Sequence, residues 1–165
     1  MSTETQAARP RFEQLIREHG GRIRRIARRF AADGAVDDLV QDMLVRLWRS
    51  HTGFRGDAKV ETWIYRVCLN AAMTHVGATV KARAVHAAAV QHSGAGAAGA
   101  PAGADAAQIL TDFLERLGDI DASILMMYMD GLSAADMSGV LGISENAIHV
   151  RINRLKQKFR DAYVD

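Results

Sequence analysis

The side chains best suited to chemistry in this sequence are the basic residues near its C-terminal end. Guanidinium and ammonium groups neutralise phosphates, and guanidinium and amide groups donate hydrogen bonds to base edges. On one face of a predicted helix stand His149, Arg151, Asn153, Arg154, Lys156, Lys158 and Arg160. This pattern predicts a DNA-binding face. The alternative is an ordinary helical hairpin whose basic face contacts only water.

Catalytic chemistry has little support in the sequence. The six histidines are scattered, and there is neither an HExxH pattern nor a glycine-rich phosphate-binding loop. Cys68 is the only cysteine and lies between Val67 and Leu69, which favours an inert thiol in the core and excludes a disulfide framework. We therefore expect no enzyme activity, no cofactor or metal, and no small-molecule substrate.

The segment Ser133–Arg160 is predicted to position the basic face. Ser133 and Asp136 form a capping-box pattern, Gly142 ends a short helix, and Ser144 caps a second, basic helix. Two helices joined by a glycine-containing turn predict a helix-turn-helix, with the second helix in a major groove. The expected DNA contacts of this second helix are Ser144, Glu145, Asn146, His149, Arg151, Arg154 and Lys158.

Composition and charge predict an all-α protein with an uneven charge distribution. The chain has 165 residues, 48% hydrophobic content, two prolines and almost no strand-like alternation. Residues 1–90 hold 15 Lys/Arg against 9 Asp/Glu, whereas residues 105–136 hold one Arg and seven acids. The acidic segment lies beside the basic helix, as expected of a protein-binding face next to a phosphate-binding face.

The N-terminal part begins with an expected loose polar tail over residues 1–10 and continues in a helical pattern from Phe12 to Phe30. A break or kink is expected at Gly20–Gly21. A dense arginine set lies in this pattern, and it has two open interpretations: a solvated face, or a contact with phosphate or an acidic protein. The set is Arg17, Arg22, Arg24, Arg25, Arg28 and Arg29.

Two further helices are predicted before residue 77. The first opens at Asp37 and Asp38, where acids suit a helix N-terminus. The second begins near Ala58 and carries aromatic residues interleaved with Arg and Asn. Trp63 and Tyr65 on that helix have two interpretations: stacking on unpaired bases, or packing at the edge of the core.

The predicted architecture is two small helical domains joined by a flexible Gly/Ala-rich linker. Residues 91–107 lack any large apolar side chain. The boundaries are therefore an N-terminal domain over 1–90, the linker over 91–107, and a helix-turn-helix domain over 108–165. In the last domain, one helix follows residue 108 and another is expected to be capped by Asp121.

Together these segments resemble the bacterial RNA polymerase sigma factors of the extracytoplasmic-function type, within the sigma-70 superfamily. AVDDLVQDMLVRLWR resembles the family's polymerase-binding helix, FRGDAKVETWIYRVCLNAAMTHV its promoter-melting stretch, and GLSAADMSGVLGISENAIHVRINRLKQKFR its helix-turn-helix. The three motifs occur in the family's order and are split by a linker. The chain departs from the pattern in having few basic residues after the melting stretch, with only Lys81 and Arg83 there.

The resemblance implies a role for each motif. The residues that match the core-polymerase contacts are Asp38, Leu39, Gln41, Asp42 and Arg46. Those that match the minus-ten contacts, where a base is flipped out and the strands separate, are Phe54, Arg55, Asp57, Lys59, Trp63, Arg66 and Asn70. The second helix of the helix-turn-helix would recognise the minus-thirty-five element, and its domain would also dock on the flap of the polymerase.

The function implied is promoter-specific transcription initiation with core RNA polymerase and promoter DNA as partners, and with an anti-sigma factor as a further expected partner. The alternative is a free-standing helix-turn-helix regulator, which explains residues 133–160 and leaves both N-terminal motifs unused. A cytoplasmic location is expected, since no apolar run is long enough to span a bilayer and the N-terminus has no apolar signal core.

Overall fold

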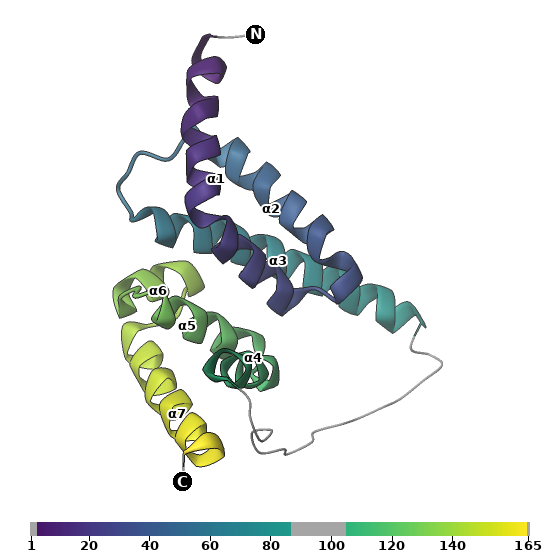
Figure 1. The fold of residues 1–165 in the computed structure, drawn as a ribbon, viewed down its shortest axis with the longest axis vertical. Coiled ribbons are helices and arrows are strands. Elements are labelled where there is room, and N and C mark those ends of the chain that lie inside the picture. The colour runs from purple at the N-terminus through teal and green to yellow at the C-terminus, as the bar shows by residue number, and fades with distance from the viewer. Residues whose placement is uncertain (1–2, 87–104, 165) are drawn as a thin grey trace. The chain divides into compact units, whose positions relative to one another are not determined.

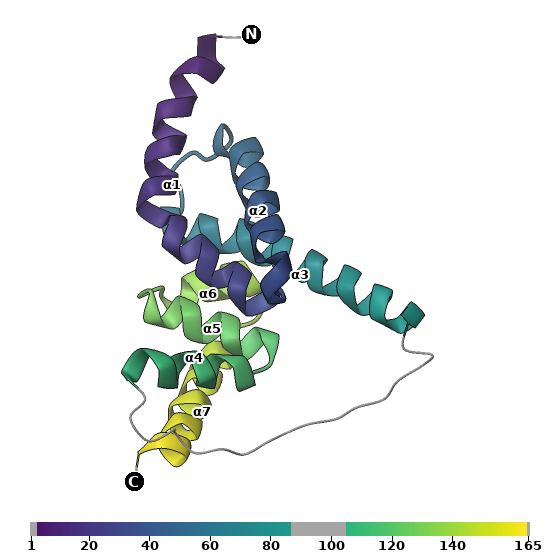
Figure 2. The same cartoon turned by 45° about the vertical axis from the view of Figure 1, so that its right-hand side comes forward.

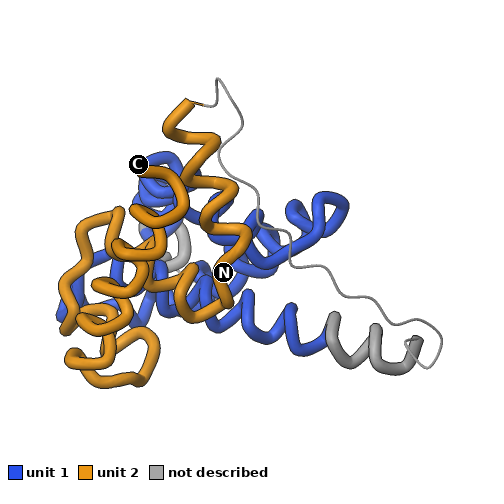
Figure 3. Tube along the Cα trace, turned by 90° about the horizontal axis from the view of Figure 1, so that it is seen from below, with its two compact units in different colours: residues 1–82 blue, residues 83–165 orange. Residues whose placement is uncertain are grey.

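The computed structural model describes residues 3–86 and 105–164, which divide into two compact units. Unit 1 comprises residues 1–82 and unit 2 residues 83–165 (Figure 3). The described residues form helices and short turns without a strand, so the all-α prediction is confirmed. Residues 91–104, most of the predicted linker, lie outside the described part.

Unit 1 is built from three long helices and one short turn of 3-10 helix. They are α1 (Thr3–Phe30), η1 (Asp33–Ala35), α2 (Val36–His51) and α3 (Val60–His86). α1 packs along α2, and α3 crosses both (Figures 1 and 2). Apolar side chains spaced three or four residues apart on each helix are buried where the helices meet, among them Ile23, Ile26, Leu39, Met43, Leu47 and Ile64.

One sequence prediction about α1 is wrong, because residues 3–10 are helical rather than a loose tail. Gly20–Gly21 were expected to give a break or a kink; they do not break the helix, but α1 bends near its middle (Figures 1 and 2). Pro10 removes one backbone donor, but a pair of side chains four residues apart spans this turn, with Arg9 Nε 3.0 Å from Glu13 Oε1. The two glycines cost helix propensity without ending the helix, since tertiary packing of the following turns outweighs that cost.

α3 is buried around much more of its circumference than its sequence indicates. Thr62, Trp63 and Tyr65 are only 3%, 7% and 0% exposed. The interpretation of Trp63 and Tyr65 as packed core residues is therefore the one the structure favours. Arg66 and Asn70, one turn apart on the same helix, are exposed.

Unit 2 contains four shorter helices. They are α4 (Ala106–Arg116), α5 (Asp119–Met129), α6 (Ala134–Leu141) and α7 (Glu145–Tyr163). α7 packs against α5 and α6, and its Ile148 is fully buried together with Met126, Met127 and Ile124 of α5. These contacts give the C-terminal unit its own apolar core.

Two helix starts in unit 2 differ from the prediction. α4 begins inside the expected linker, because Asp105 caps it by accepting a hydrogen bond from the backbone N–H of Gln108 at 2.8 Å. α5 is preceded by Gly118 as its N-cap rather than by Asp121, which lies in its first turn. An acid is stabilised at either position by the helix dipole, so the sequence alone did not separate the two.

Across the ranges 3–86 and 105–164, every helix is too short or too polar to cross a lipid bilayer.

Cys68 provides a test of unit 1 packing. Burial raises the pKa of its thiol from 9.0 to about 12, because the thiolate would lose its hydration. The unfolded chain ionises above pH 9 while the folded chain does not, so stability is lost as pH rises from about 9 towards 12. Between pH 8 and pH 10 we expect Cys68 to account for a loss of about 1.4 kcal/mol in the free energy of unfolding.

The measurement is urea unfolding of unit 1 at a series of pH values, with Cys68→Ala as the control. The variant is expected to be less stable at neutral pH. It should also lack the part of the decrease in the free energy of unfolding at alkaline pH that Cys68 causes. Equal pH dependence in the two proteins, or rapid alkylation of Cys68 in the folded wild type, would contradict a buried thiol.

Candidate nucleic-acid interface

The helix-turn-helix of unit 2 has the local geometry that its sequence predicts. The Ser133 hydroxyl accepts a hydrogen bond from the backbone N–H of Asp136 at 3.1 Å, and the Asp136 carboxylate accepts one from the Ser133 N–H at 3.1 Å. Gly142 ends α6 with φ of 70°, a conformation that glycine adopts without strain. Ser144 then caps α7 by accepting from the Ala147 N–H at 3.2 Å. The predicted caps and turn are confirmed.

α7 has a buried apolar stripe and a wide exposed face. Ile148, Ile152 and Leu155 are buried, which turns the opposite side of the helix to solvent. Six of the seven predicted DNA contacts are exposed there, namely Ser144, Glu145, Asn146, His149, Arg154 and Lys158. Sequence reasoning left out Val150, 41% exposed, whereas Asn153 was placed on the basic face without being counted among the contacts and is also exposed. Their place opposite the buried stripe follows from the helical period alone.

Arg151, the seventh predicted DNA contact, lies on the flank of α7 and points towards α5. Its Nη1 atom donates to Asp121 Oδ1 at 2.7 Å, and the side chains are 39% and 23% exposed. Lys156 on the other flank lies 4.8 Å from the ring centroid of Tyr128, near the end of α5. The cations Arg151 and Lys156, one on each flank of α7, therefore both contact α5. Arg154, in contrast, has no ion-pair partner among the described residues.

This difference predicts unequal effects of two arginine substitutions. We expect Arg154→Ala to weaken duplex binding by about 1–3 kcal/mol if its guanidinium contacts a base. Arg151→Ala is expected to cost about 1 kcal/mol or less of unit 2 stability, since the ion pair is partly exposed, and to weaken DNA binding less. Filter binding of the polymerase-bound protein to duplex DNA, with thermal unfolding of each variant, checks both. Greater loss of binding for Arg151→Ala would show that Arg151 leaves Asp121 for DNA.

Unit 1 contains a hollow of about 520 Å³ beside the loop that joins α2 to α3. Phe54 and Trp63 stack in its wall, with ring centroids 4.9 Å apart and planes inclined by 30°. Three elements contribute cations to the lining: Arg49 from α2, Arg55 from the loop and Arg66 from α3. The guanidinium groups of these three arginines have no ion-pair or hydrogen-bond partner within the described ranges.

The predicted minus-ten residues divide according to this geometry. Phe54, Arg55, Asp57, Trp63 and Arg66 are gathered around the hollow, although Trp63 is mostly buried. Lys59 and Asn70 are also exposed, but they do not line the hollow. Arg49 lines the hollow and was missed, because it belongs to the helix expected to contact polymerase.

The exposed side of α2 carries four of the five residues matched to polymerase binding. Asp38 and Gln41 are exposed, and Asp42 Oδ2 lies 2.9 Å from Arg46 Nε. Leu39 is only 2% exposed and packs inside unit 1, so the structure does not bring it to this surface. Val45, 44% exposed and seven residues after Asp38, adds an apolar patch that the matched set did not include.

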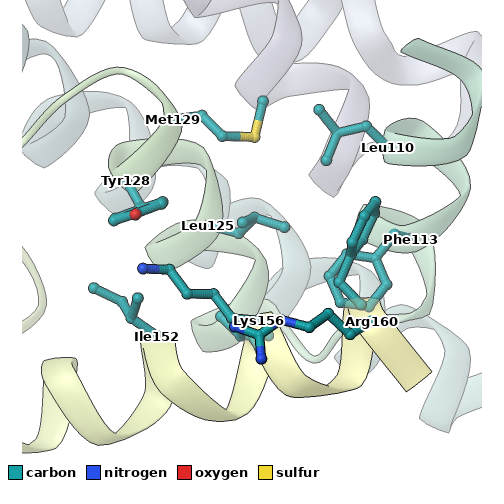
Figure 4. A pocket seen from close by; sticks show the side chains of 10 residues that line it. Leu110, Phe113, Leu125, Tyr128, Met129, Ile152, Lys156 and Arg160 are labelled. Atoms are coloured by element: carbon teal, nitrogen blue, oxygen red, sulfur yellow. The ribbon is translucent and has the colours of Figure 1, made fainter. Parts of the chain in front are cut away.

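Unit 2 also has an apolar groove of about 300 Å³ between α4, α5 and α7. Figure 4 shows side chains of the three helices gathered around it. Leu110, Phe113, Leu125, Met129 and Ile152 form its apolar lining, while Lys156 and Arg160 lie along its α7 side. In the described part of the chain, no cluster of His, Cys, Asp or Glu side chains has the arrangement of a metal site.

Comparison with known proteins matches both units to one family. Residues 15–80 match the Sigma-70 region 2 model, and residues 107–159 match the Sigma-70, region 4 model. The chain is 30% identical over 151 residues to the ECF RNA polymerase sigma factor SigM of Mycobacterium tuberculosis H37Rv, covering 89% of this chain and 74% of SigM. It is 23% identical over 158 residues to the ECF RNA polymerase sigma-E factor of Escherichia coli K12, covering 88% and 83% of the two chains.

Two solved structures share the fold. The sigma factor RpoE, in complex with the anti-sigma factor NepR from Bartonella quintana, superposes with a TM-score of 0.70 at 19% identity, covering 92% of this chain and 95% of RpoE. CnrH, in complex with the cytosolic domain of CnrY, superposes with a TM-score of 0.64 at 25% identity, covering 94% and 91% of the chains.

Proposed function

We propose that the two units have different roles, because the chain belongs to the ECF sigma factors of RNA polymerase, within the sigma-70 family. As a sigma factor, the protein acts in transcription initiation, with core RNA polymerase and promoter DNA as partners. In the proposal, unit 1 contacts core polymerase and the melted minus-ten strand. Unit 2 binds the minus-thirty-five duplex.

The observation that carries this assignment is the hollow beside the Phe54–Trp63 stack. An unpaired base has two π faces, and stacking on an aromatic side chain stabilises it by about 1–3 kcal/mol. The hollow has both an aromatic wall and unpaired cations, which suit a base and its sugar-phosphate backbone. A duplex offers no free base to such a hollow. The arrangement therefore favours a single strand with one base unstacked.

Capture of that base would supply the energy for opening. Unstacking a base costs a few kcal/mol, least where stacking is weak, so the identity of the captured base contributes to promoter selectivity. Arg66 and Asn70, exposed four residues apart on α3, would hold the neighbouring strand. In this account the chain catalyses no reaction itself. The free energy of binding the captured base and its strand drives strand separation.

The exposed side of α2 is the proposed contact with core polymerase. Asp38, Gln41 and the Asp42–Arg46 pair surround the apolar Val45. A small apolar centre within a polar rim is the usual composition of a protein interface. Leu39 supports this surface from inside unit 1 and makes no contact in the proposal.

The exposed face of α7 is the proposed contact with the minus-thirty-five element. Asn146 and Asn153 are suited to adenine, Arg154 to guanine or phosphate, and Val150 to a thymine methyl group. Glu145, His149 and Lys158 complete the face at its edges. Arg151 would contribute through a phosphate on the flank of the helix, where Asp121 already orients it.

The apolar groove of unit 2 is the proposed contact with the polymerase flap. Its apolar lining and the adjacent cations Lys156 and Arg160 suit an amphipathic segment with acidic residues. We further propose that an anti-sigma factor regulates the protein by covering such surfaces, since RpoE was solved in complex with the anti-sigma factor NepR. The protein would act in the cytoplasm, with the polymerase.

A free-standing helix-turn-helix regulator accounts for unit 2 alone. It gives no role to the region 2 match over residues 15–80 or to the aromatic hollow. Co-purification with core polymerase, followed by transcription in vitro, separates the two functions. A sigma factor is expected to bind core enzyme and to start transcription at defined sites, whereas a regulator would bind duplex DNA and leave core enzyme inactive.

A further inference from the structure

Arg49 is placed to act on DNA although it belongs to the helix assigned to polymerase. It lies in the last turn of α2, where a cation is stabilised by the helix dipole, and its side chain is exposed. Apart from Arg49 and its neighbour Ser50, the hollow is formed by the loop and by α3. Arg49 therefore brings a positive charge to the hollow from a third element.

The charges around the hollow favour an anionic ligand group. Arg49, Arg55 and Arg66 face a single lining carboxylate, that of Asp57, so positive charge is in excess. No ion-pair partner among the described residues neutralises these arginines. Each nucleotide carries one phosphate beside its base, so a base stacked on the aromatic wall would bring a phosphate to the same hollow.

The chemistry of Arg49 distinguishes a phosphate contact from recognition of a base edge. Selective recognition of a base edge needs the two parallel hydrogen bonds of a guanidinium held in the plane of the base. In this hollow the stacked rings of Phe54 and Trp63 already offer a surface for the face of the base, and Arg49 lies at the end of a different helix. A phosphate accepts hydrogen bonds from several directions and so does not require that fixed geometry.

We propose that Arg49 binds the backbone phosphate adjacent to the base captured in the hollow, and so strengthens single-strand binding without selecting the base. The inference rests on the proposed function of the hollow. It adds a contact with DNA at the end of α2, one helix turn beyond the polymerase-binding residue Arg46.

The test compares polymerase holoenzymes that contain wild-type protein, Arg49→Gln or Phe54→Ala. Binding to oligo-dA, oligo-dC and oligo-dT is measured at several salt concentrations, with core polymerase alone as background. Glutamine keeps a polar side chain and removes the charge. Arg11→Gln, an exposed arginine of α1 that neither lines the hollow nor belongs to the dense arginine set, is the matched control.

Arg49→Gln is expected to lower affinity for all three oligonucleotides by the same factor. The slope of log Kd against log salt should fall by about 0.7, the value for one phosphate contact with a single strand. Loss for one oligonucleotide only would show recognition of a base edge and overturn the inference. An unchanged salt slope, or a loss equal to that of Arg11→Gln, would also overturn it.

The behaviour of Phe54→Ala separates this inference from the function on which it rests. If Phe54→Ala weakens binding and Arg49→Gln does not, the hollow still binds single strand and only the role of Arg49 is wrong. If the wild-type holoenzyme binds single strand no better than core enzyme, the proposed function of the hollow is wrong and the inference fails with it.

Discussion

Holoenzyme carrying Arg66→Ala together with Asn70→Ala is expected to bind promoter duplex but to leave it closed. The two side chains are exposed one turn apart on α3, beside the hollow, so they are available to a separated strand. Removing a contact with a base should cost about 1–3 kcal/mol of open-complex stability, and removing a contact with phosphate adds to that loss. Each 1.4 kcal/mol or so of this loss shifts the equilibrium about tenfold from the open towards the closed complex.

The promoter for this experiment is selected with the wild-type holoenzyme from random duplexes, and opening is measured by fluorescence of 2-aminopurine placed in the selected site. Circular dichroism and core-polymerase binding establish that the variant is folded. Arg11→Ala on α1 controls for the lost charge. Normal opening by the double variant would remove the assignment of α3 to the melted strand.

Reversing two acids on α2 is expected to abolish stable association with core polymerase. Asp38→Lys with Asp42→Lys changes one helix face, and the second change also replaces the 2.9 Å attraction to Arg46 by repulsion. Breaking charged pairs buried in an interface costs about 2–5 kcal/mol each, whereas the same changes on a free surface cost about 0.5 kcal/mol. Binding should therefore fall far more than stability.

Glu13→Lys with Glu18→Lys is the matched control for this prediction. The two acids are exposed on α1, and they too bond to neighbours four residues away, Arg9 and Gln14 respectively. The control protein is expected to co-purify with core enzyme in gel filtration, and the α2 variant to elute alone. Equal behaviour of the two variants would show that net charge, rather than the α2 surface, controls association.

Local patterns predicted the helix-turn-helix well because its geometry is determined within a few residues. Ser133, Asp136, Gly142 and Ser144 each satisfy backbone groups of their own helix ends, so their roles follow from sequence spacing. The order of the three family motifs likewise needed only the sequence. Both predictions depended on short-range information.

The sequence did not predict features that depend on contacts between distant segments. The Arg151–Asp121 pair joins residues 30 positions apart, so its partner could not be chosen from the several acids of the preceding segment. α3 has weak apolar periodicity, and the burial of Tyr65 became apparent only once α1 and α2 were in place. Arg49 was missed because the hollow assembles from a helix, a loop and a second helix.

The most direct measurement of the central claim is permanganate reactivity of thymines in the selected promoter, with core polymerase and this protein added separately and together. The account predicts reactive thymines at the minus-ten element only when both are present, in a position fixed by a minus-thirty-five footprint upstream. Reactivity that is unchanged by the protein, alongside duplex binding by the protein alone, would contradict the account and leave a helix-turn-helix regulator as the function.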